Sequence, residues 1–210
     1  MGDWDKYVSA EFRLEFPKGS VVLDVGCGDD NQMRELAREG CLPLGIDIDT
    51  PSLVKCRIAG LVVIRAVAEK LPVADASLDG IVCKVVLPYT REAQAIAEFG
   101  RVLKPGGKVY LIGHGAGYYL NYLLLSRSTM LRIYALRSLA NTWFHNLTGH
   151  RLPGFLGDTV YQSHRRLGQN YERGSMQVRE ETASKKFMGF PVFIYQAVEK
   201  VAPIPTNSSK

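Results

Sequence analysis

The sequence predicts a doubly wound α/β domain built on a mostly parallel sheet. An apolar, valine-rich run at 21–25 reads as a buried strand, and two glycines spaced by one residue, Gly26 and Gly28, follow it. A helical pattern then begins at once. Strand, glycine turn and helix in this order open the nucleotide site of doubly wound domains. Strand and helix patterns continue to alternate as far as residue 112, which is typical of parallel strands joined by crossover helices.

Capping and stop residues predict where the first helices and strands begin and end. The helix after the glycine turn is expected to stop at Gly40, and a second strand covers 42–46 and ends in Asp47. Thr50 is the expected N-cap of the next helix, because a proline follows it at N1, and Gly60 is the expected stop.

The middle of the chain predicts two more strands and one helix. A third strand is expected at 62–66, and a loop over 68–77 leads into the fourth. The helix predicted at 89–103 carries an apolar stripe on one side. It ends at the Lys-Pro-Gly-Gly turn at 104–107, which cannot continue a helix, and a fifth strand is expected at 108–112.

The remaining segments are expected to surround this sheet. Residues 1–19 are interpreted as a short helical lead-in, and 116–156 as a helical insert that covers the substrate, with a break near Asn141. A helix is expected at 158–171. The last two strands, predicted at 175–181 and 190–201, would form a C-terminal antiparallel hairpin.

Composition favours one intracellular domain. The chain has 210 residues and 46% apolar content, enough for one good core, so 1–201 are expected to form a single domain and 202–210 a disordered tail. We expect a cytoplasmic protein, because no N-terminal stretch has the basic-then-apolar form of a secretory signal. The four cysteines show no C-x-x-C pair, which favours reduced thiols over a disulfide or zinc framework.

The charge of the glycine turn distinguishes between nucleotide ligands. A dinucleotide fingerprint has a third glycine where this chain has Asn31. Asp29 and Asp30 in the turn would repel a pyrophosphate, and Asp24 lies two residues before the first glycine. An acidic rim suits a ligand that combines a nucleoside, an ammonium and a sulfonium without phosphate. S-adenosylmethionine (SAM) has this composition.

An acid about 20 residues beyond the glycine turn would complete such a site. Asp47, at the end of the second strand, is placed to accept hydrogen bonds from both ribose hydroxyls, with Ile48 on the adenine face. The alternative is that Asp47 is an ordinary loop acid or a helix cap, because Asp49 is equally acidic two residues later.

Four ordered motifs then resemble class I SAM-dependent methyltransferases, most closely the methyltransferase-11 group. They are DVGCG at 24–28, GID at 45–47, LPVADASLD at 71–79 and RVLKPGG at 101–107. The resemblance covers about residues 20–113 and implies a seven-stranded, Rossmann-like methyltransferase fold with SAM as cofactor. It implies cofactor-binding roles for nine residues: Asp24, Gly26, Cys27 and Gly28 around the methionine part, Asp47 on the ribose, Ile48 beside the adenine, Ala68 and Glu69 near the adenine amine through their backbone, and Lys84 beside the methionine part.

Methyl transfer requires little catalytic equipment beyond an in-line arrangement of the two partners. A general base is required only if the acceptor must lose a proton. His114, at the carboxyl end of the fifth strand, is the first candidate, and Tyr89, after the fourth, is the second. The other histidines lack paired metal-ligand spacing, so no metal is expected.

The charge of the predicted insert is the evidence in the sequence on the kind of acceptor. Residues 116–166 contain six arginines and one acid, Asp158, so this segment carries the whole formal net charge of +5. A packed helical insert with solvated arginines, a pocket for an anionic or glycosylated acceptor, and contact with a membrane surface are the three alternatives. Nucleic acid is disfavoured, because no Lys/Arg run is present and 84–89 (KVVLPY) lack the Asn/Asp-Pro-Pro-aromatic tetrad of base-amine methyltransferases.

The sequence therefore predicts an enzyme that methylates a small-molecule, lipid-linked or sugar-linked acceptor at oxygen or carbon. The alternative is a SAM-fold binding or scaffold protein without catalysis, because Asp30 and Val67 depart from the family pattern. An oxidoreductase on the same fold is the third hypothesis. The oligomeric state is left open.

Overall fold

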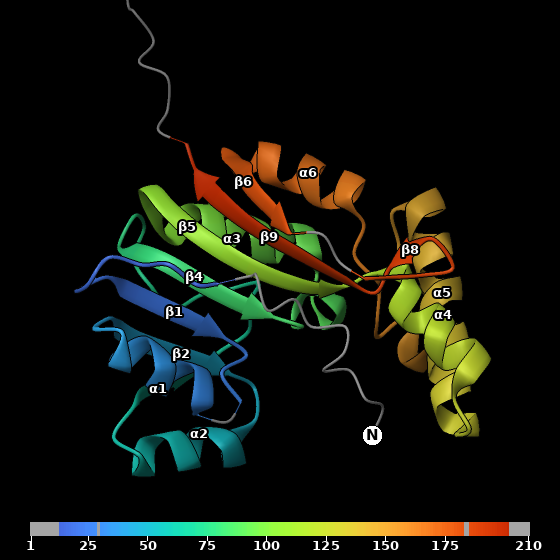
Figure 1. Cartoon of the computed structure of the whole chain (residues 1–210), viewed down its shortest axis with the longest axis horizontal. Helices are drawn as coiled ribbons and strands as arrows, with labels where there is room; N and C mark the ends of the chain where they lie inside the picture. The colour runs from blue at the N-terminus through green and yellow to red at the C-terminus, as the bar shows by residue number, and fades with distance from the viewer. Residues whose placement is uncertain (1–12, 29, 183–184, 202–210) are drawn as a thin grey trace, which may run out of the picture.

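The computed structural model describes residues 13–28, 30–182 and 185–201, which fold around a seven-stranded sheet (Figure 1). The strand order is β3-β2-β1-β4-β5-β9-β6, with β1 to β5 parallel and β9 antiparallel to both of its neighbours. The strands of this sheet are β1 (Val21–Val25), β2 (Leu42–Asp47), β3 (Val62–Arg65), β4 (Leu78–Lys84), β5 (Leu103–His114), β6 (Met176–Thr182) and β9 (Phe193–Lys200). The predicted fold class, including the C-terminal antiparallel pair, is confirmed.

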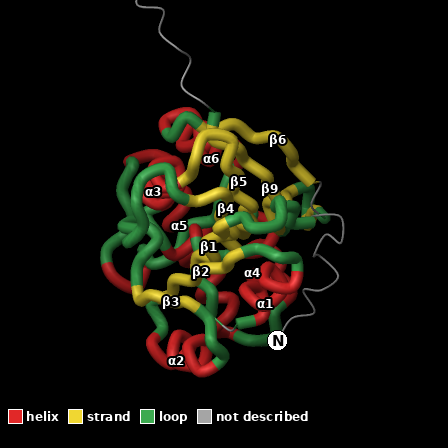
Figure 2. The backbone as a smooth tube through the Cα atoms, turned by 90° about the vertical axis from the view of Figure 1, so that its left-hand side faces the viewer, coloured by secondary structure: helices red, strands yellow, loops and turns green. Residues whose placement is uncertain are grey.

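Helices cover both faces of the sheet. They are α1 (Asn31–Arg38), α2 (Thr50–Ile58), α3 (Glu92–Val102), α4 (Ala116–Leu125), α5 (Thr129–Thr148) and α6 (His164–Arg173), with short 3-10 turns at Leu87–Tyr89 and Gly154–Leu156. Figure 2 shows α1 and α3 on opposite sides of the strands. Between β6 and β9, two short strands, β7 (Lys186–Phe187) and β8 (Phe190–Pro191), form a separate ribbon.

Strand alternation explains how the two faces are filled. Adjacent residues of a strand point to opposite faces, and β1 shows this directly. Val22 packs in a cluster with Leu36 of α1, whereas Leu23 packs in the main core with Phe99 of α3 and Leu167 of α6. Both faces of β1 are therefore buried, as its continuous apolar run predicts.

The helical insert lies beyond the carboxyl end of the parallel strands. In Figure 1, α4 and α5 stand beside one another at the right of the sheet, past the tips of β4 and β5. α4 begins two residues after His114, the last residue of β5, and also contacts the β7–β8 ribbon. The insert therefore stands where a doubly wound sheet holds its ligands.

The predicted helix break near Asn141 is wrong. α5 runs through this residue, whose side chain is fully buried. Its Nδ2 donates to the carbonyl of Thr159 at 2.7 Å, and its Oδ1 accepts from the backbone N–H of Leu152 at 2.9 Å. The amide thus ties the helix to the segment that follows it and leaves the helix backbone intact. The break falls earlier, where Ser128 caps the start of α5.

The starts of two other helices also differ from the prediction. Asp49 rather than Thr50 is the N-cap of α2, since its carboxylate accepts the backbone N–H of Ser52 at 3.0 Å. The helix expected from residue 158 begins only at His164, because the preceding segment is held extended against the end of the sheet. There the N–H of Gln162 donates to the carbonyl of His114 at 2.8 Å.

The N-terminal prediction can be judged only in part. Residues 13–20 contain no helix, and residues 1–12 lie outside the described residues, as does the predicted tail at 202–210. Phe16 packs edge-on against Tyr110, with ring centroids 5.1 Å apart. Residues 13–19 thus cover the sheet without a helix, whereas the rest of the predicted lead-in lies outside the described residues. Within the described part of the chain, no helix has both the length and the apolar character needed to cross a membrane.

Candidate cofactor and acceptor site

The carboxyl ends of four parallel strands meet at one edge of the sheet and bring most of the predicted site residues together. Register places Asp24 beside Gly45 of β2 on one side and beside Val82 of β4 on the other. Asp47 ends β2 and Lys84 ends β4, while His114 ends β5. Residues distant in sequence therefore share one rim, where open α/β sheets bind ligands.

The glycine turn has the backbone shape that a closely approaching ligand needs. Gly26 and Gly28 have φ angles of 73° and 46°, in the region that glycine adopts without strain. A Cβ at Gly26 would lie 2.3 Å from Cγ2 of Val86, so this position accepts no side chain. At Gly28 the space is open, with the Gly26 carbonyl 3.9 Å away as the nearest neighbour. The turn thus exposes backbone toward a ligand.

Asp47 joins the end of β2 to this turn. Its Oδ2 accepts the backbone N–H of Gly28 and its Oδ1 accepts that of Asp49, both at 2.8 Å. A carboxylate has about four lone-pair sites, so each oxygen can accept a further bond from a ribose hydroxyl. Asp49 instead uses its carboxylate on Ser52, and these hydrogen bonds hold the pKa of Asp49 below its usual range. The cap is Asp49, and Asp47 is the acid at the turn.

Fewer acidic side chains face the rim than the sequence suggested. Asp30 forms an ion pair with Arg34 at 2.6 Å within α1, so its charge is compensated and is not directed at a ligand. Asp29 lies outside the described residues. The buried Asp24 and the half-buried Asp47 are the acids that remain at the described part of the rim.

The predicted adenine-side residues occupy the loops after β2 and β3. Ile48 is 65% exposed, although it is a large aliphatic side chain, and it directly follows Asp47. Ala68 is buried. Glu69 uses its carboxylate to accept the backbone N–H of Arg91 at 2.8 Å, so it also holds the start of α3. Lys84 donates to Gln32 of α1, which links the end of β4 to the turn after β1.

A cluster of tyrosines surrounds both candidate bases. His114 stacks on Tyr118 with ring centroids 3.7 Å apart and contacts Tyr119 edge-on. Tyr119 in turn contacts Tyr134 of α5, and the hydroxyl of Tyr134 lies 3.2 Å from that of Tyr89. Ring contacts and one hydroxyl–hydroxyl contact therefore connect His114 to Tyr89. The sequence identified the two end members but gave no reason to connect them.

Burial determines the protonation of these groups. It lowers the pKa of His114 to about 3, so the imidazole is neutral near pH 7. Among the described residues, its Nδ1 has no hydrogen-bond partner. Partial burial, and then the contact with Tyr134, raise the pKa of Tyr89 above its usual range. Tyr89 is therefore a hydrogen-bond donor, and His114 is the better proton acceptor of the two.

The structure adds two features near the site that sequence reasoning missed. Val85 has a φ of 59°, which is strained for a β-branched residue, and it stands between Lys84 and the Val86 side chain that packs on Gly26. No sequence signal marks it. Tyr134 comes from the insert and could have been suspected from the aromatic content of that segment, but only the path of α5 brings it to Tyr89.

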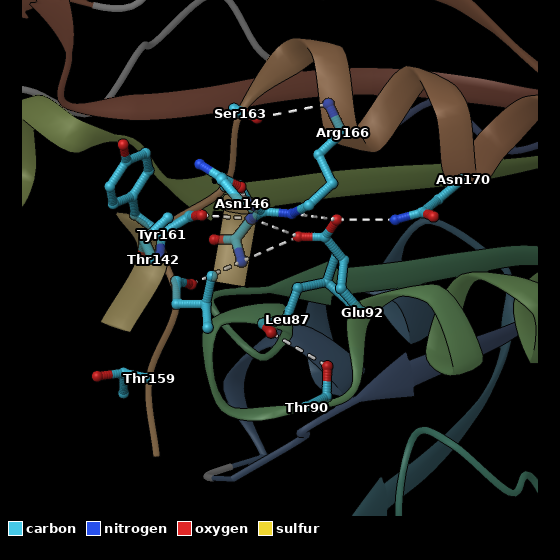
Figure 3. Close-up of polar contacts among 12 residues, drawn as sticks. Leu87, Thr90, Glu92, Thr142, Asn146, Thr159, Tyr161, Ser163, Arg166 and Asn170 are labelled. Carbon is cyan, nitrogen blue, oxygen red and sulfur yellow. Dashed lines mark hydrogen bonds and ion pairs between the residues drawn. The ribbon is translucent and has the colours of Figure 1, made fainter. Parts of the chain in front are cut away.

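A buried ionic network anchors the insert to the sheet domain (Figure 3). Glu92, in the first turn of α3, accepts two hydrogen bonds from Arg166 of α6, both at 3.0 Å, and one from Asn170 at 2.9 Å. Arg166 also donates to Asn146 of α5 at 3.1 Å and to the carbonyl of Tyr161. One carboxylate thus positions α5 and α6 relative to α3.

The geometry agrees with what known proteins show. Residues 23–111 match a family model described as a methyltransferase domain. A solved SAM-dependent methyltransferase from Methanosarcina mazei has the same fold, with a TM-score of 0.64 at 20% identity, covering 90% of this chain and 95% of the other. The chain thus carries a match to a methyltransferase domain over residues 23–111 and has the fold of SAM-dependent methyltransferases. SAM is the cofactor of this family, and the open glycine turn with Asp47 beneath it fits a nucleoside that lacks phosphate.

The chain matches only part of the length of its curated relatives. A tRNA (carboxymethyluridine(34)-5-O)-methyltransferase from Arabidopsis thaliana is 35% identical over 51% of this chain and 27% of that protein. A ubiquinone biosynthesis O-methyltransferase from Xanthomonas oryzae pv. oryzae is 35% identical over 50% of this chain and 46% of that protein. The chain thus spans less than half the length of either relative.

Proposed function

We propose that this chain transfers the methyl group of SAM to an oxygen or carbon of a small-molecule, lipid-linked or sugar-linked acceptor. The observation that carries the proposal is the hydrogen bond from the Gly28 N–H to Asp47 Oδ2 at 2.8 Å. This bond joins the two cofactor motifs at the same edge of the sheet at which the tyrosine cluster lies. An oxygen acceptor is supported by both curated relatives, which are named O-methyltransferases.

The residues of the rim would hold the cofactor by complementary chemistry. Asp24, Gly26, Cys27 and Gly28 would contact the methionine part, and Lys84 would pair with its carboxylate. Asp47 would accept hydrogen bonds from the ribose, and Ile48 would cover the adenine, with Ala68 and Glu69 at its amine. When bound, SAM supplies an electrophilic methyl group on a sulfonium.

His114 would receive the proton of an acceptor hydroxyl. A base with a pKa of about 3 drives proton transfer weakly from an ordinary alcohol. A hydroxyl becomes strongly acidic as its oxygen gains the methyl group, so a neutral imidazole suffices at that stage. The proton would go to Nδ1, which lacks a partner among the described residues. Tyr89, protonated and paired with Tyr134, would orient the acceptor by donating a hydrogen bond.

The outer surface of α5 supports a lipid-bearing acceptor. Four apolar side chains recur along this helix with exposed fractions between 48% and 67%: Ile133, Leu136, Trp143 and Leu147. Residues 116–157 contain no acid, and Arg127 and Arg132 stand near the start of the helix. An apolar stripe beside basic residues suits a lipid chain with an anionic head.

The first test is calorimetric titration with SAM and with S-adenosylhomocysteine. We expect both to bind, and the Asp47→Ala variant to lose about 1.5–3 kcal/mol of binding free energy, the range for hydrogen bonds to a charged group. Asp49→Ala is the matched control, because it removes an equal charge two residues away but only uncaps α2.

Each result of this titration has a defined meaning. If the folded protein binds neither compound, the proposed function is wrong. An unchanged affinity in Asp47→Ala would mean that the ribose lies elsewhere. Release of S-adenosylhomocysteine is then followed with pools of phenolic, glycosidic and lipid-extracted acceptors. Tight binding without turnover across these pools would support the scaffold alternative.

A further inference from the structure

A basic cavity lies on the insert side of α3, apart from the residues assigned to the cofactor. It has a volume of about 850 Å³ and lies between the first turn of α3, the end of α5 and α6. None of the residues predicted to bind SAM lines it, and neither His114 nor Tyr89 does. Five arginines line it, and they are Arg91, Arg151, Arg165, Arg166 and Arg173.

The positive charge of this cavity is largely uncompensated. Glu92 is the acidic residue among the described residues that line it, and Arg166 already uses both of its carboxylate oxygens. The other four arginines form no ion pair with a described residue. Glu69 lies nearby, but its carboxylate accepts a hydrogen bond from the backbone N–H of Arg91 and not from its guanidinium. Four guanidinium groups thus share one cavity without an ion pair to a described carboxylate, although Glu92 and Glu69 act on Arg151 from a distance.

Part of this charge is also withdrawn from water. Arg151 is half-buried, and its guanidinium donates to the carbonyl of Thr90. Burial lowers the pKa of Arg151, and burial together with Arg166 and Arg151 lowers that of His145 in the same wall. A partly desolvated cation without a counter-ion costs free energy that a bound anion would offset.

The size and the donors indicate the kind of anion. Guanidinium groups bind phosphate oxygens in a planar, bidentate manner. Four uncompensated cations match a diphosphate better than a single carboxylate. A cavity of about 850 Å³ accepts an organic molecule rather than a bare ion, since ligand pockets typically span about 300–1,000 Å³. The first turn of α3 adds a helix dipole that favours negative charge.

We propose that this cavity is a second ligand site, which binds the diphosphate group of an organic phosphate through Arg91, Arg151, Arg165 and Arg173. The site is independent of the cofactor rim. It places a phosphate group beside the segment that follows Tyr89, because Arg91 comes two residues after that tyrosine.

The test is calorimetric titration with inorganic pyrophosphate and with uridine diphosphate, with and without saturating S-adenosylhomocysteine. We expect 1:1 binding of both compounds. The double variant Arg165→Gln/Arg173→Gln should weaken it about tenfold or more, because both side chains are exposed in the cavity and form no ion pair with a described residue. The single variant Arg173→Gln should show a smaller loss in the same direction. S-adenosylhomocysteine affinity should stay unchanged in each, which separates this proposal from the proposed function.

The matched control is Arg38→Gln/Arg127→Gln, which removes the same charge from two exposed arginines outside the cavity. It should change pyrophosphate affinity less than twofold. Equal losses in the two double variants would show general electrostatic attraction and overturn the proposal. Absence of pyrophosphate binding would overturn it too. A third result would also overturn the proposal. If neither diphosphate binds but a single-stranded RNA does, and its binding depends on Arg165 and Arg173, the surface is a nucleic-acid surface.

Discussion

His114 shows how strongly burial changes a single side chain in this protein. The residue is 5% exposed, and desolvation lowers its pKa from the ordinary 6.5 to about 3. No acid pairs with it among the described residues, so nothing favours its charged form. The position of a histidine at the end of β5 is visible in the sequence. Its protonation state is not, because the tyrosines and Phe193 that bury it come from α4 and β9.

His114 should therefore make the protein less stable as the pH is lowered. Below pH 6.5 the imidazole is protonated in the unfolded chain but stays neutral in the folded chain until about pH 3. The contribution of His114 to the free energy of unfolding is therefore complete above pH 6.5 and declines as the pH falls from there. The decline is at most about 1.4 kcal/mol per pH unit, or about 2 kcal/mol by pH 5.

Urea unfolding at pH 7.5 and pH 5.0 measures this effect. We expect the native protein to lose about 2 kcal/mol more between these pH values than His114→Phe, which keeps the ring contacts. His164→Gln, at an exposed histidine, should behave like the native protein. Identical pH dependence in native protein and His114→Phe would show that His114 takes up its proton in the folded state.

Among the elements, the attachment of the insert depends on one carboxylate. Glu92 is 7% exposed at the start of α3 and is bonded to two residues of α6. The sequence places this glutamate in a helix but gives no partner for it. Arg166 is 74 residues away along the chain, so only the packing of α6 on α3 reveals the pair.

Glu92→Gln should destabilise the protein by about 3 kcal/mol or more, because Arg166 would keep a buried charge without its counter-ion. Chemical unfolding followed by circular dichroism gives the value. Arg166→Met and the double variant Glu92→Met/Arg166→Met complete a double-mutant cycle. The double variant should lose less than the sum of the two single losses. Strict additivity would show that the two side chains are not coupled.

At the scale of the whole molecule, the reactivity of the four cysteines measures whether the protein is folded. All four are buried and none forms a disulfide, and they come from both faces of the sheet. Burial raises the pKa of Cys27 and of Cys83 to about 12, so neither forms a reactive thiolate near neutral pH.

Thiol labelling should therefore follow global unfolding. We expect the native protein to react with iodoacetamide far more slowly than the urea-unfolded chain, in which all four thiols react. Intact-mass spectrometry over time measures both. Rapid labelling of Cys27 alone would contradict this expectation and would show that the glycine turn opens by itself. Cys56, fully buried beneath the same turn, is the internal control.

Local patterns in the sequence were enough to predict the sheet and which residues meet at its carboxyl edge. Strand periodicity, the glycine turn and Asp47 are local signals, because each depends on residues a few positions apart and on parallel strands ending at one edge. Tertiary structure decided the rest. The counter-charge on Asp30, the unbroken α5, the tyrosine cluster and the basic cavity all depend on which distant segments come into contact. Side-chain burial and ion pairing are set by those contacts, and no local pattern encodes them.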